Sequence, residues 1–287
     1  NDRRGNIIAE PATNYFVSRV RQDLSNVDAQ FGGFISAVNR DFSGSFLEDY
    51  LHESAYQTGV DAQYYWKDRN WGASGVFNLS SVNGTENVLL NTQTTSARFF
   101  NRIDSKELSV DSTLTSLTGY FGEFSIGKYG GSGLRYSFTY SEMSPEYEIN
   151  DMGFLERADY RAPHYYLEYL NVESNLFQFY LLWGEISHAW NFDGDMIFNY
   201  YSVAGYFQLN NLWTVYSSLG VTGRFYNDRI ARGGPTMLRP KDWNTFLQMT
   251  TEASKNTFGD FSTSYRSLIR QRWRKSLRCI TRKSEKT

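Results

Sequence analysis

The strongest constraint on this chain is a period-two alternation of apolar and polar residues that persists over segments of ten or more positions. Between residues 56 and 67, one set of alternate positions reads Tyr, Thr, Val, Ala, Tyr, Trp, and the set between them reads Gln, Gly, Asp, Gln, Tyr, Lys. Successive side chains of a β-strand point to opposite sides, so this segment is predicted to be a strand with one apolar and one polar face. Segment 70–79 repeats the pattern after the polar turn Asp68-Arg69, which indicates a hairpin.

The same alternation recurs along the chain and predicts about 12–13 strands in total. Many of these segments are longer than the roughly 5–6 residues of soluble sandwich strands. They reach the roughly 9–11 residues with which a tilted strand crosses a bilayer. We therefore predict an all-β fold, and within it a transmembrane antiparallel up-and-down β-barrel. Besides the hairpin, the predicted strands are 14–23, 28–40, 95–101, 114–128, 134–141, 162–171, 176–190, 197–209, 213–225, 241–253 and 256–266.

The connections between the predicted strands alternate in length, which is a second mark of such barrels. Short links at 68–69, 130–133 and 210–211 lie between longer connections. Transmembrane barrels have short turns at one rim and long loops at the other. Because the strand count does not establish that the sheet closes on itself, the barrel within this chain is expected to be partial. The longer connections are 41–52, 83–94, 102–113, 143–161 and 227–240.

The composition agrees with a sheet that has lipid on one side and water on the other. Aromatic residues make up 17% of the chain, whereas hydrophobic residues make up only 40% and the mean hydropathy is −0.52. Rings at both membrane interfaces and polar residues toward a wet lumen account for this combination. No run approaches the roughly 18 apolar residues that a membrane-spanning helix requires, so a membrane protein of this sequence would cross with strands.

Charge divides the chain into two parts. Residues 266–287 contain nine Lys or Arg against one acidic residue, Glu285, which leaves 20 basic and 30 acidic residues elsewhere, a net charge of −10. We predict that 1–265 form the partial outer-membrane barrel domain and that 266–287 form a basic tail. A basic arm for nucleic acid or anionic lipid is one interpretation of the tail. A disordered or non-native terminus is the favoured one, because a barrel normally ends on an aromatic strand, and no nucleic-acid partner is expected.

Four short stretches give the chain a resemblance to a known family. In order they are 37–41 (AVNRD), 95–100 (TSARFF), 151–159 (DMGFLERAD) and 232–237 (RGGPTM). On these stretches the chain resembles the DUF5916 family of bacterial outer-membrane barrels, over most of its length. The resemblance implies an outer-membrane location in a Gram-negative bacterium and a link to glycans, because longer members carry a family 9 carbohydrate-binding module before the barrel. It implies no reaction, and the tail matches nothing in the family.

Residue types that carry chemistry are sparse in this chain. The three histidines, His52, His164 and His188, form no metal-binding motif, and Ser187 beside His188 would point to the opposite side of a strand. Segment 191–195 (NFDGD) is a carboxylate-rich glycine turn that lacks the remaining ligands of a calcium loop. A single cysteine excludes an internal disulfide and a Cys-rich zinc site. We therefore expect no catalytic residues, no metal and no cofactor, and the sequence favours a role without catalysis.

Two loops concentrate the charged residues that are candidates for a specific role. Both combine arginines with carboxylates, which form geometrically specific and often bidentate pairs. One hypothesis is that the loops enter the lumen or cap its mouth and form an ion-paired constriction for a polar solute. The alternative is that the pairs brace the barrel wall. Trp190, at a strand end, is a candidate for stacking on a sugar ring or for the lipid interface. The cluster comprises Asp151, Glu156, Arg157, Asp159, Arg161, Arg229, Arg232 and Arg239.

Three functions remain open from the sequence. The first is an outer-membrane barrel with a polar lumen that serves as a glycan-associated channel, docking or uptake component, with the lipid bilayer and an oligo- or polysaccharide as partners. The second is a membrane-associated glycan hydrolase whose catalytic part lies in the barrel or outside this chain. The third is a soluble β-sandwich interaction module, for which the predicted strands are too long and too aromatic on one face.

Overall fold

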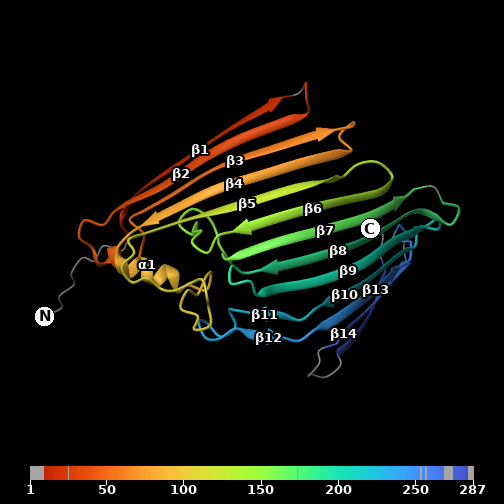
Figure 1. Ribbon diagram of the computed structural model, residues 1–287. Helices are drawn as coiled ribbons and strands as arrows, with labels where there is room; N and C mark the ends of the chain where they lie inside the picture. The colour runs from red at the N-terminus through yellow and green to blue at the C-terminus, as the bar shows by residue number, and fades with distance from the viewer. Residues whose placement is uncertain are drawn as a thin grey trace.

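A curved antiparallel sheet makes up most of the protein in the computed structural model, which describes residues 10–24, 26–172, 174–252, 254–255, 257–267 and 274–283 (Figure 1). Strands pair in chain order, apart from one step from β10 to β13 over a separate hairpin of β11 (Phe225–Asn227) and β12 (Met237–Arg239). The strands of the sheet are β1 (Ala12–Leu24), β2 (Ala29–Asp41), β3 (Ser54–Trp66), β4 (Trp71–Asn83), β5 (Ser116–Lys128), β6 (Gly133–Met143), β7 (Tyr160–Asn171), β8 (Phe177–Trp190), β9 (Met196–Leu209), β10 (Thr214–Thr222), β13 (Asp242–Thr250), β14 (Thr257–Ser267) and β15 (Arg274–Lys283).

The topology of the sheet is up-and-down, with antiparallel pairing at each step. One edge of the sheet is β1, and the other is reached through β14 and β15. Within the described residues no pairing joins the two edges, so the sheet is open. The predicted all-β, antiparallel, up-and-down fold is confirmed, and its closure into a barrel remains a proposal.

Every predicted strand except 95–101 coincides with a strand of the sheet. That prediction is wrong, because residues 95–101 form turns that follow a short helix, α1 (Glu86–Gln93), which the alternation did not indicate. Residues 97–100 are all buried, so consecutive side chains enter the interior instead of pointing to opposite sides. Thr85 caps the first turn of α1 with its side-chain oxygen. No helix in the described part of the chain is long and apolar enough to cross a membrane.

The two rims of the sheet differ in the way the connection lengths predict. Turns such as 67–70, 129–132 and 210–213 join strands at one rim, which we call the turn rim (Figure 1). The opposite loop rim carries the long connections, which hold α1, the 3-10 turn η1 (Phe46–Asp49) and the hairpin of β11 and β12. We call four connections of this rim, three long and one short, the loop layer: residues 84–115, 144–159, 191–195 and 223–241.

The loop layer folds back over one face of the sheet, which we call the inner face; the opposite side is the outer face. Val38, Ala55, Val82 and Leu117 lie in one row across β2–β5, and none is more than 4% exposed. Leu89 of α1 packs against this row. A second buried cluster joins the loop layer to the end of β6; its members are Ala97, Met143, Tyr147, Leu155 and Ala158. The interior of the protein therefore lies between the loop layer and the inner face.

The predicted basic tail is described only in part. Arg266 and Ser267 end β14, and residues 274–283 form β15, which pairs with β14. Residues 268–273 and 284–287 lie outside the described residues. The division of the chain into 1–265 and 266–287 therefore stays a prediction.

Candidate functional site

Large apolar side chains stand exposed on the outer face of neighbouring strands. Val60 is 60% exposed, Leu167 51% and Val203 57%. A sheet that folds in water normally turns its apolar face to a core and its polar face to solvent. Here the apolar face carries the exposed side chains, and they form a belt across the strands. The belt also includes Phe31, Ile35, Tyr56, Phe77, Leu79, Phe124, Ile126, Leu134, Tyr165, Leu182, Ile186, Leu219 and Leu247.

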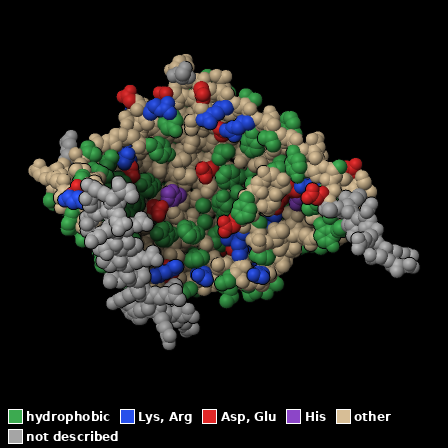
Figure 2. All heavy atoms as spheres, turned by 180° about the vertical axis from the view of Figure 1, so that it is seen from behind, with side chains coloured by type: hydrophobic (Ala, Val, Ile, Leu, Met, Phe, Trp, Pro, Cys, Tyr) green, Lys and Arg blue, Asp and Glu red, His purple; other side chains and the backbone are tan. Residues whose placement is uncertain are grey.

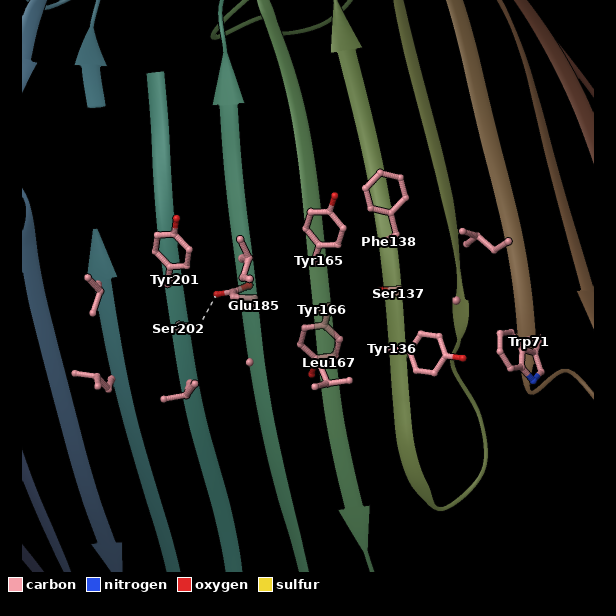
Figure 3. A pocket seen from close by; sticks show the side chains of 17 residues that line it. Trp71, Tyr136, Ser137, Phe138, Tyr165, Tyr166, Leu167, Glu185, Tyr201 and Ser202 are labelled. Carbon is pink, nitrogen blue, oxygen red and sulfur yellow. Dashed lines mark hydrogen bonds between the residues drawn. The ribbon is translucent and has the colours of Figure 1, made fainter. Parts of the chain in front are cut away.

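A groove of about 850 Å3 runs across the strands within this outer belt (Figure 3). In register, Tyr136 lies opposite Leu167 and Leu167 opposite Gly184, so one side of the groove crosses β6, β7 and β8. Gly184 contributes no side chain there. The rings of Phe138 and Tyr165 stand in the next row, with centroids 5.0 Å apart. The groove is therefore an apolar furrow bordered by aromatic rings.

Charged groups border the outer belt where it approaches the loop rim. Arg161 Nε lies 3.4 Å from Glu142 Oε2, and the Arg161 guanidinium lies 3.9 Å from the ring centroid of Phe192. Trp190 is directly across from Arg161 in the pairing of β7 with β8. Since paired residues share a face, Trp190 belongs to the outer face and lies away from the inner one.

The inner face is polar beyond the part that the loop layer covers. Seen from behind, the molecule is hollowed, and charged side chains lie in and around the hollow (Figure 2). Amides add to this wall, as where Gln63 Nε2 donates to Gln30 Oε1 at 2.6 Å. Three arginines of this wall stand beside carboxylates, and His164, which is positive only when protonated, lies beside Glu185. The pairs are Arg19–Asp61 (2.8 Å), Arg135–Glu168 (2.5 Å), Arg266–Asp242 (2.7 Å) and His164–Glu185 (3.3 Å).

Three rings cross this polar wall on β8, β10 and β13. The ring centroids of Trp183 and Tyr216 are 5.9 Å apart, and those of Tyr216 and Phe246 are 5.7 Å apart. We call these three residues the ring stripe. Glu168 lies directly across from Trp183, and Gln248 directly across from Tyr216. The stripe thus offers aromatic surface flanked by a carboxylate and an amide, a combination that the sequence analysis did not single out.

Asp151, from the predicted cluster, joins three parts of the loop rim. Its carboxylate oxygens lie 2.7 Å from Arg40 Nη1 on β2 and 2.7 Å from His52 Nδ1. On its other side, His52 Nε2 lies 2.8 Å from Thr92 Oγ1 on α1. Burial alone would raise the pKa of Asp151, but the hydrogen bond and charge of His52, and then those of Arg40, lower it below its usual value. An ionised Asp151 therefore ties the first predicted loop to the sheet and the helix.

The second predicted loop meets the first through Asp228 and Arg229. Arg157 makes a bidentate pair with Asp228, with N–O distances of 3.1 and 2.6 Å. Burial, followed by the charge of Arg157, lowers the pKa of Arg229 to about 9, so its guanidinium remains charged at neutral pH. The two loops are thus cross-linked within the loop layer. Arg229 donates to the backbone carbonyls of Ser96, Ala97, Glu156 and Ala158.

Arg102, which the sequence analysis missed, lies at the centre of this network. Its side chain is 1% exposed, and Nη2 is 2.6 Å from Asp193 and 3.8 Å from Asp159. Asp193 also accepts hydrogen bonds from the backbone N–H groups of residues 106–107, each at 2.9 Å. The Asp193 carboxylate therefore holds residues 102–107 of the loop layer against the 191–195 turn. Burial raises the pKa of Asp159, and a backbone hydrogen bond and the nearby arginines offset only part of that rise.

The remaining members of the predicted cluster lie at the surface. Glu156, Arg232 and Arg239 are exposed, and none forms an ion pair with another described residue. Arg232 precedes Gly233, whose φ is +91° and whose backbone approaches Asn101 so closely that a Cβ would lie 2.3 Å from Asn101 Nδ2. This stretch is therefore shaped to fit the loop layer. The cluster therefore divides into residues that brace the loop layer and residues that stand at the surface without an ion pair among the described residues.

Asp151, His52 and Thr92 follow the carboxylate, imidazole, hydroxyl order of a hydrolase triad. Thr92 is only 5% exposed, however, and its Oγ1 donates to Val88 O at 2.9 Å inside α1. A nucleophile must be reachable by the group that it attacks, and this hydroxyl is not. The arrangement therefore braces the helix against the loop. The described residues contain no group of three His, Cys, Asp or Glu side chains that could hold a metal ion.

The comparison with family models matches nearly the whole chain, over residues 1–283, to a domain of unknown function, DUF5916. The match extends into the basic tail, so the expectation that the tail matches nothing in the family is wrong. The chain belongs to the DUF5916 family. No curated protein matches it. In this DUF5916 chain, stretches that are far apart in sequence meet at the loop rim: Arg40 pairs with Asp151, and Ala158 N donates to Ala97 O at 3.0 Å. The motifs that carry the family resemblance thus include the residues that fix the loop layer to the sheet.

Proposed function

We propose that this DUF5916 chain forms the wall of a transmembrane barrel in the outer membrane of a Gram-negative bacterium. The polarity of the two faces carries the proposal, because the exposed outer face is apolar and the hollowed inner face is polar. Burying one Val, Leu, Ile or Phe side chain contributes about 1.5–3 kcal/mol, so a belt of such residues strongly favours transfer into lipid. Rings and charges at the rims would then lie at the two membrane interfaces.

Lipid also requires that both edges of the sheet be paired, since the hydrocarbon core offers no water to unsatisfied backbone groups. At its edge of the sheet, β1 pairs with β2 and with no other strand of the described residues. The proposal therefore includes a strand that pairs with β1 and closes the ring. Short turns would face the periplasm and the loop rim the exterior, as in bacterial barrels generally.

Within that barrel we propose a docking or uptake component for a polar solute, with a glycan as the ligand class. The loop layer is buried against the sheet and braced by ion pairs such as Arg98–Glu148, whose N–O distance is 2.6 Å. A rim closed by packed loops favours docking or gated uptake over a permanently open channel. The surface arginines Arg232 and Arg239 are available at that rim for the first contact with a solute.

The ring stripe is the part of the inner wall best suited to a glycan. Apolar sugar faces stack on aromatic rings, and the flanking Glu168 and Gln248 can hydrogen-bond to hydroxyl groups. Arg135, directly across from Glu168, is paired with its carboxylate at 2.5 Å. A wall on which Arg19, Arg135 and Arg266 are already paired with carboxylates favours a neutral oligosaccharide over an anionic one.

A second candidate is a membrane-associated glycan hydrolase, and the line from Asp151 through His52 to Thr92 is the observation in its favour. The burial of Thr92 supports the docking role instead. Replacement of Thr92 by Val distinguishes the two, because a hydrolase would lose turnover whereas glycan binding would persist. A soluble interaction module, the third function, conflicts with the uncovered outer belt.

The deciding experiment is to express the full-length protein with its export signal in a Gram-negative host and to fractionate the envelope. Detergent-extracted protein is then run on a gel with and without boiling. We expect the protein in the outer-membrane fraction and a heat-dependent shift in mobility, as for a closed barrel. Recovery in the soluble fraction without any shift would contradict the proposal.

A further inference from the structure

We propose that the groove on the outer face binds one anionic diacyl phospholipid, whose phosphate lies between Lys67 and Lys128 at the turn rim. This inference rests on the membrane location proposed above. It goes further by naming a ligand class, a place on the barrel and the charge of the headgroup.

The groove has the size and chemistry of an acyl-chain site. Its volume of about 850 Å3 lies within the range of well-formed ligand pockets. The rings of Tyr136, Phe138 and Tyr165 border it, and Leu167 lies beside Tyr136 on the neighbouring strand (Figure 3). Gly184, directly across from Leu167, leaves the furrow open where a side chain would otherwise fill it. An extended hydrocarbon chain fits such an apolar furrow better than a polar ligand does.

Lys128 is an exception within the apolar belt. It is paired with Trp71 on one side and with Tyr136 on the other, so its side chain emerges on the outer face beside the groove. A lysine on the lipid face is costly at the bilayer centre and nearly free at the interface, where the amine reaches the headgroups. Trp71, which also lines the groove, marks the same level. Lys128 therefore places this end of the groove at the headgroup region.

Lys67 adds a second positive charge at the same end. Its Nζ lies 5.6 Å from the ring centroid of Trp71, and Lys128 is directly across from Trp71 in the pairing of β4 with β5. Arg69, two residues further in the same turn, is already paired with Asp28 at 2.9 Å.

Neither lysine is neutralised by a carboxylate of the described chain. Lys128 Nζ donates instead to the backbone carbonyl of Leu134 at 2.9 Å. Two unneutralised amines at the membrane surface attract an anionic headgroup. The apolar groove and this charged end together select a lipid over a free anion, because inorganic phosphate gains nothing from the groove.

The test is a lipid titration of the full-length protein, purified from outer membranes in mild detergent and stripped of bound lipid. Tryptophan fluorescence is quenched by lipids with brominated acyl chains, and the part of the quenching that Trp71→Phe abolishes reports occupancy beside Trp71, one of seven tryptophans. We compare phosphatidylglycerol with phosphatidylcholine of the same chains. One basic residue near an anionic surface strengthens binding about fivefold, so we expect the wild type to prefer phosphatidylglycerol by roughly 10- to 30-fold.

The double variant K67Q/K128Q should lose that preference and bind both lipids alike. The matched control K241Q, a surface lysine at the loop rim, should keep it. The variant V203F narrows the groove and should weaken both lipids without changing their ratio. The heat-dependent mobility shift must be retained in each variant, which shows that the barrel still forms.

Equal affinity of the wild type for the two lipids would overturn the inference, and so would a preference that survives in K67Q/K128Q. Displacement of the anionic lipid by excess inorganic phosphate would reassign the site to free anions and also overturn it. These outcomes leave the membrane proposal standing as long as the protein fractionates with the outer membrane. Recovery in the soluble fraction would instead remove both.

Discussion

The inner face of the sheet is built in two different ways along its length. Toward the loop rim it lies under the loop layer, where Val38 and Ala55 are fully buried and the Arg98 side chain is 0% exposed. On β6–β13 the same face is uncovered, and the side chains of Arg135 and Glu168 remain 21% and 14% exposed. One continuous set of strands therefore supports a dry core at one end and a wet wall at the other. The loops that cover the sheet, and not the strands, determine where the exposed polar wall begins.

The largest expected effect comes from breaking a buried ion pair at the covered end. Arg98→Met removes the partner of Glu148 and several hydrogen bonds to backbone carbonyls. An unpaired buried charge costs about 3–5 kcal/mol of stability, to be measured by urea unfolding in mild detergent. The control Arg19→Met breaks the exposed pair with Asp61, which should cost about 0–1 kcal/mol. Equal costs for the two variants would show that the covered end is not a dry core.

A cavity in the covered core should have the next largest effect. Leu89→Ala empties a fully buried position against the row on β2–β5, and such truncations cost about 2–5 kcal/mol. Limited proteolysis should also cleave the loop layer faster in this variant. Leu247→Ala on the outer face removes the same atoms where they are 39% exposed, so its cost should be clearly smaller. A larger loss for L247A would reverse the assignment of the core.

The dependence of stability on pH tests the loop layer further, because the pKa values of two of its carboxylates, Asp151 and Asp159, are shifted in opposite directions. The pKa of Asp151 is lowered, so its ionised form stabilises the fold above the usual value of 3.8, and that stability is lost as the pH falls through the folded-state pKa. The pKa of Asp159 is raised, so its charge opposes folding above pH 3.8 and not below.

Asp151→Asn should therefore destabilise the protein at pH 7 by about 1.5–3 kcal/mol, the range for hydrogen bonds to charged groups. Asp159→Asn should stabilise it, since the amide can still accept the hydrogen bond from Phe192 N. Both differences should shrink in unfolding titrations carried out below pH 3.8. Destabilisation by both variants at pH 7 would contradict the opposite pKa shifts of Asp151 and Asp159.

The smallest effect is expected on the open wall, where a side chain acts on a ligand more than on the fold. Trp183→Ala removes one ring of the stripe and should weaken binding of a neutral oligosaccharide about twofold to tenfold, the range for a lost aromatic contact. Isothermal titration in detergent measures the change. Trp243→Ala removes an outer-face ring that is 41% exposed and should leave glycan affinity unaltered. Equal losses for both variants would remove the stripe from the proposed site.

The sequence predicted the strands well because period-two alternation is local information. It failed at 95–101, where buried Ala97, Arg98 and Phe100 belong to a turn whose contacts are long-range. It also did not indicate α1, which has only eight residues and is held by packing against the row on β2–β5. Elements that depend on distant contacts leave little trace in a short window of sequence.

The same distinction between local and long-range information holds for the candidate site. Arginine- and acid-rich loops were identified from composition, and Arg157, Asp159 and Arg229 do meet in the loop layer. Their partners were missed, because Asp228 lies 71 residues from Arg157 and Asp193 lies 91 from Arg102. The sequence left Trp190 open between a sugar ring and the lipid interface, and the register of β7 with β8 places it on the outer face. Charged residue types could be read from the sequence, whereas their pairing needed the fold.

The up-and-down order of the strands restricts how this sheet can close, since each strand reverses the direction of the one before it. Counted across the sheet, β14 runs opposite to β1, whereas β15 runs the same way as β1. A ring that joined β15 directly to β1 would contain one parallel pair among antiparallel ones. A ring in which β14 meets β1, or in which an odd number of strands lies between β15 and β1, would be antiparallel throughout. The direction of the strand that meets β1, mapped by disulfide cross-linking of paired cysteines, therefore identifies the parity of the closed ring.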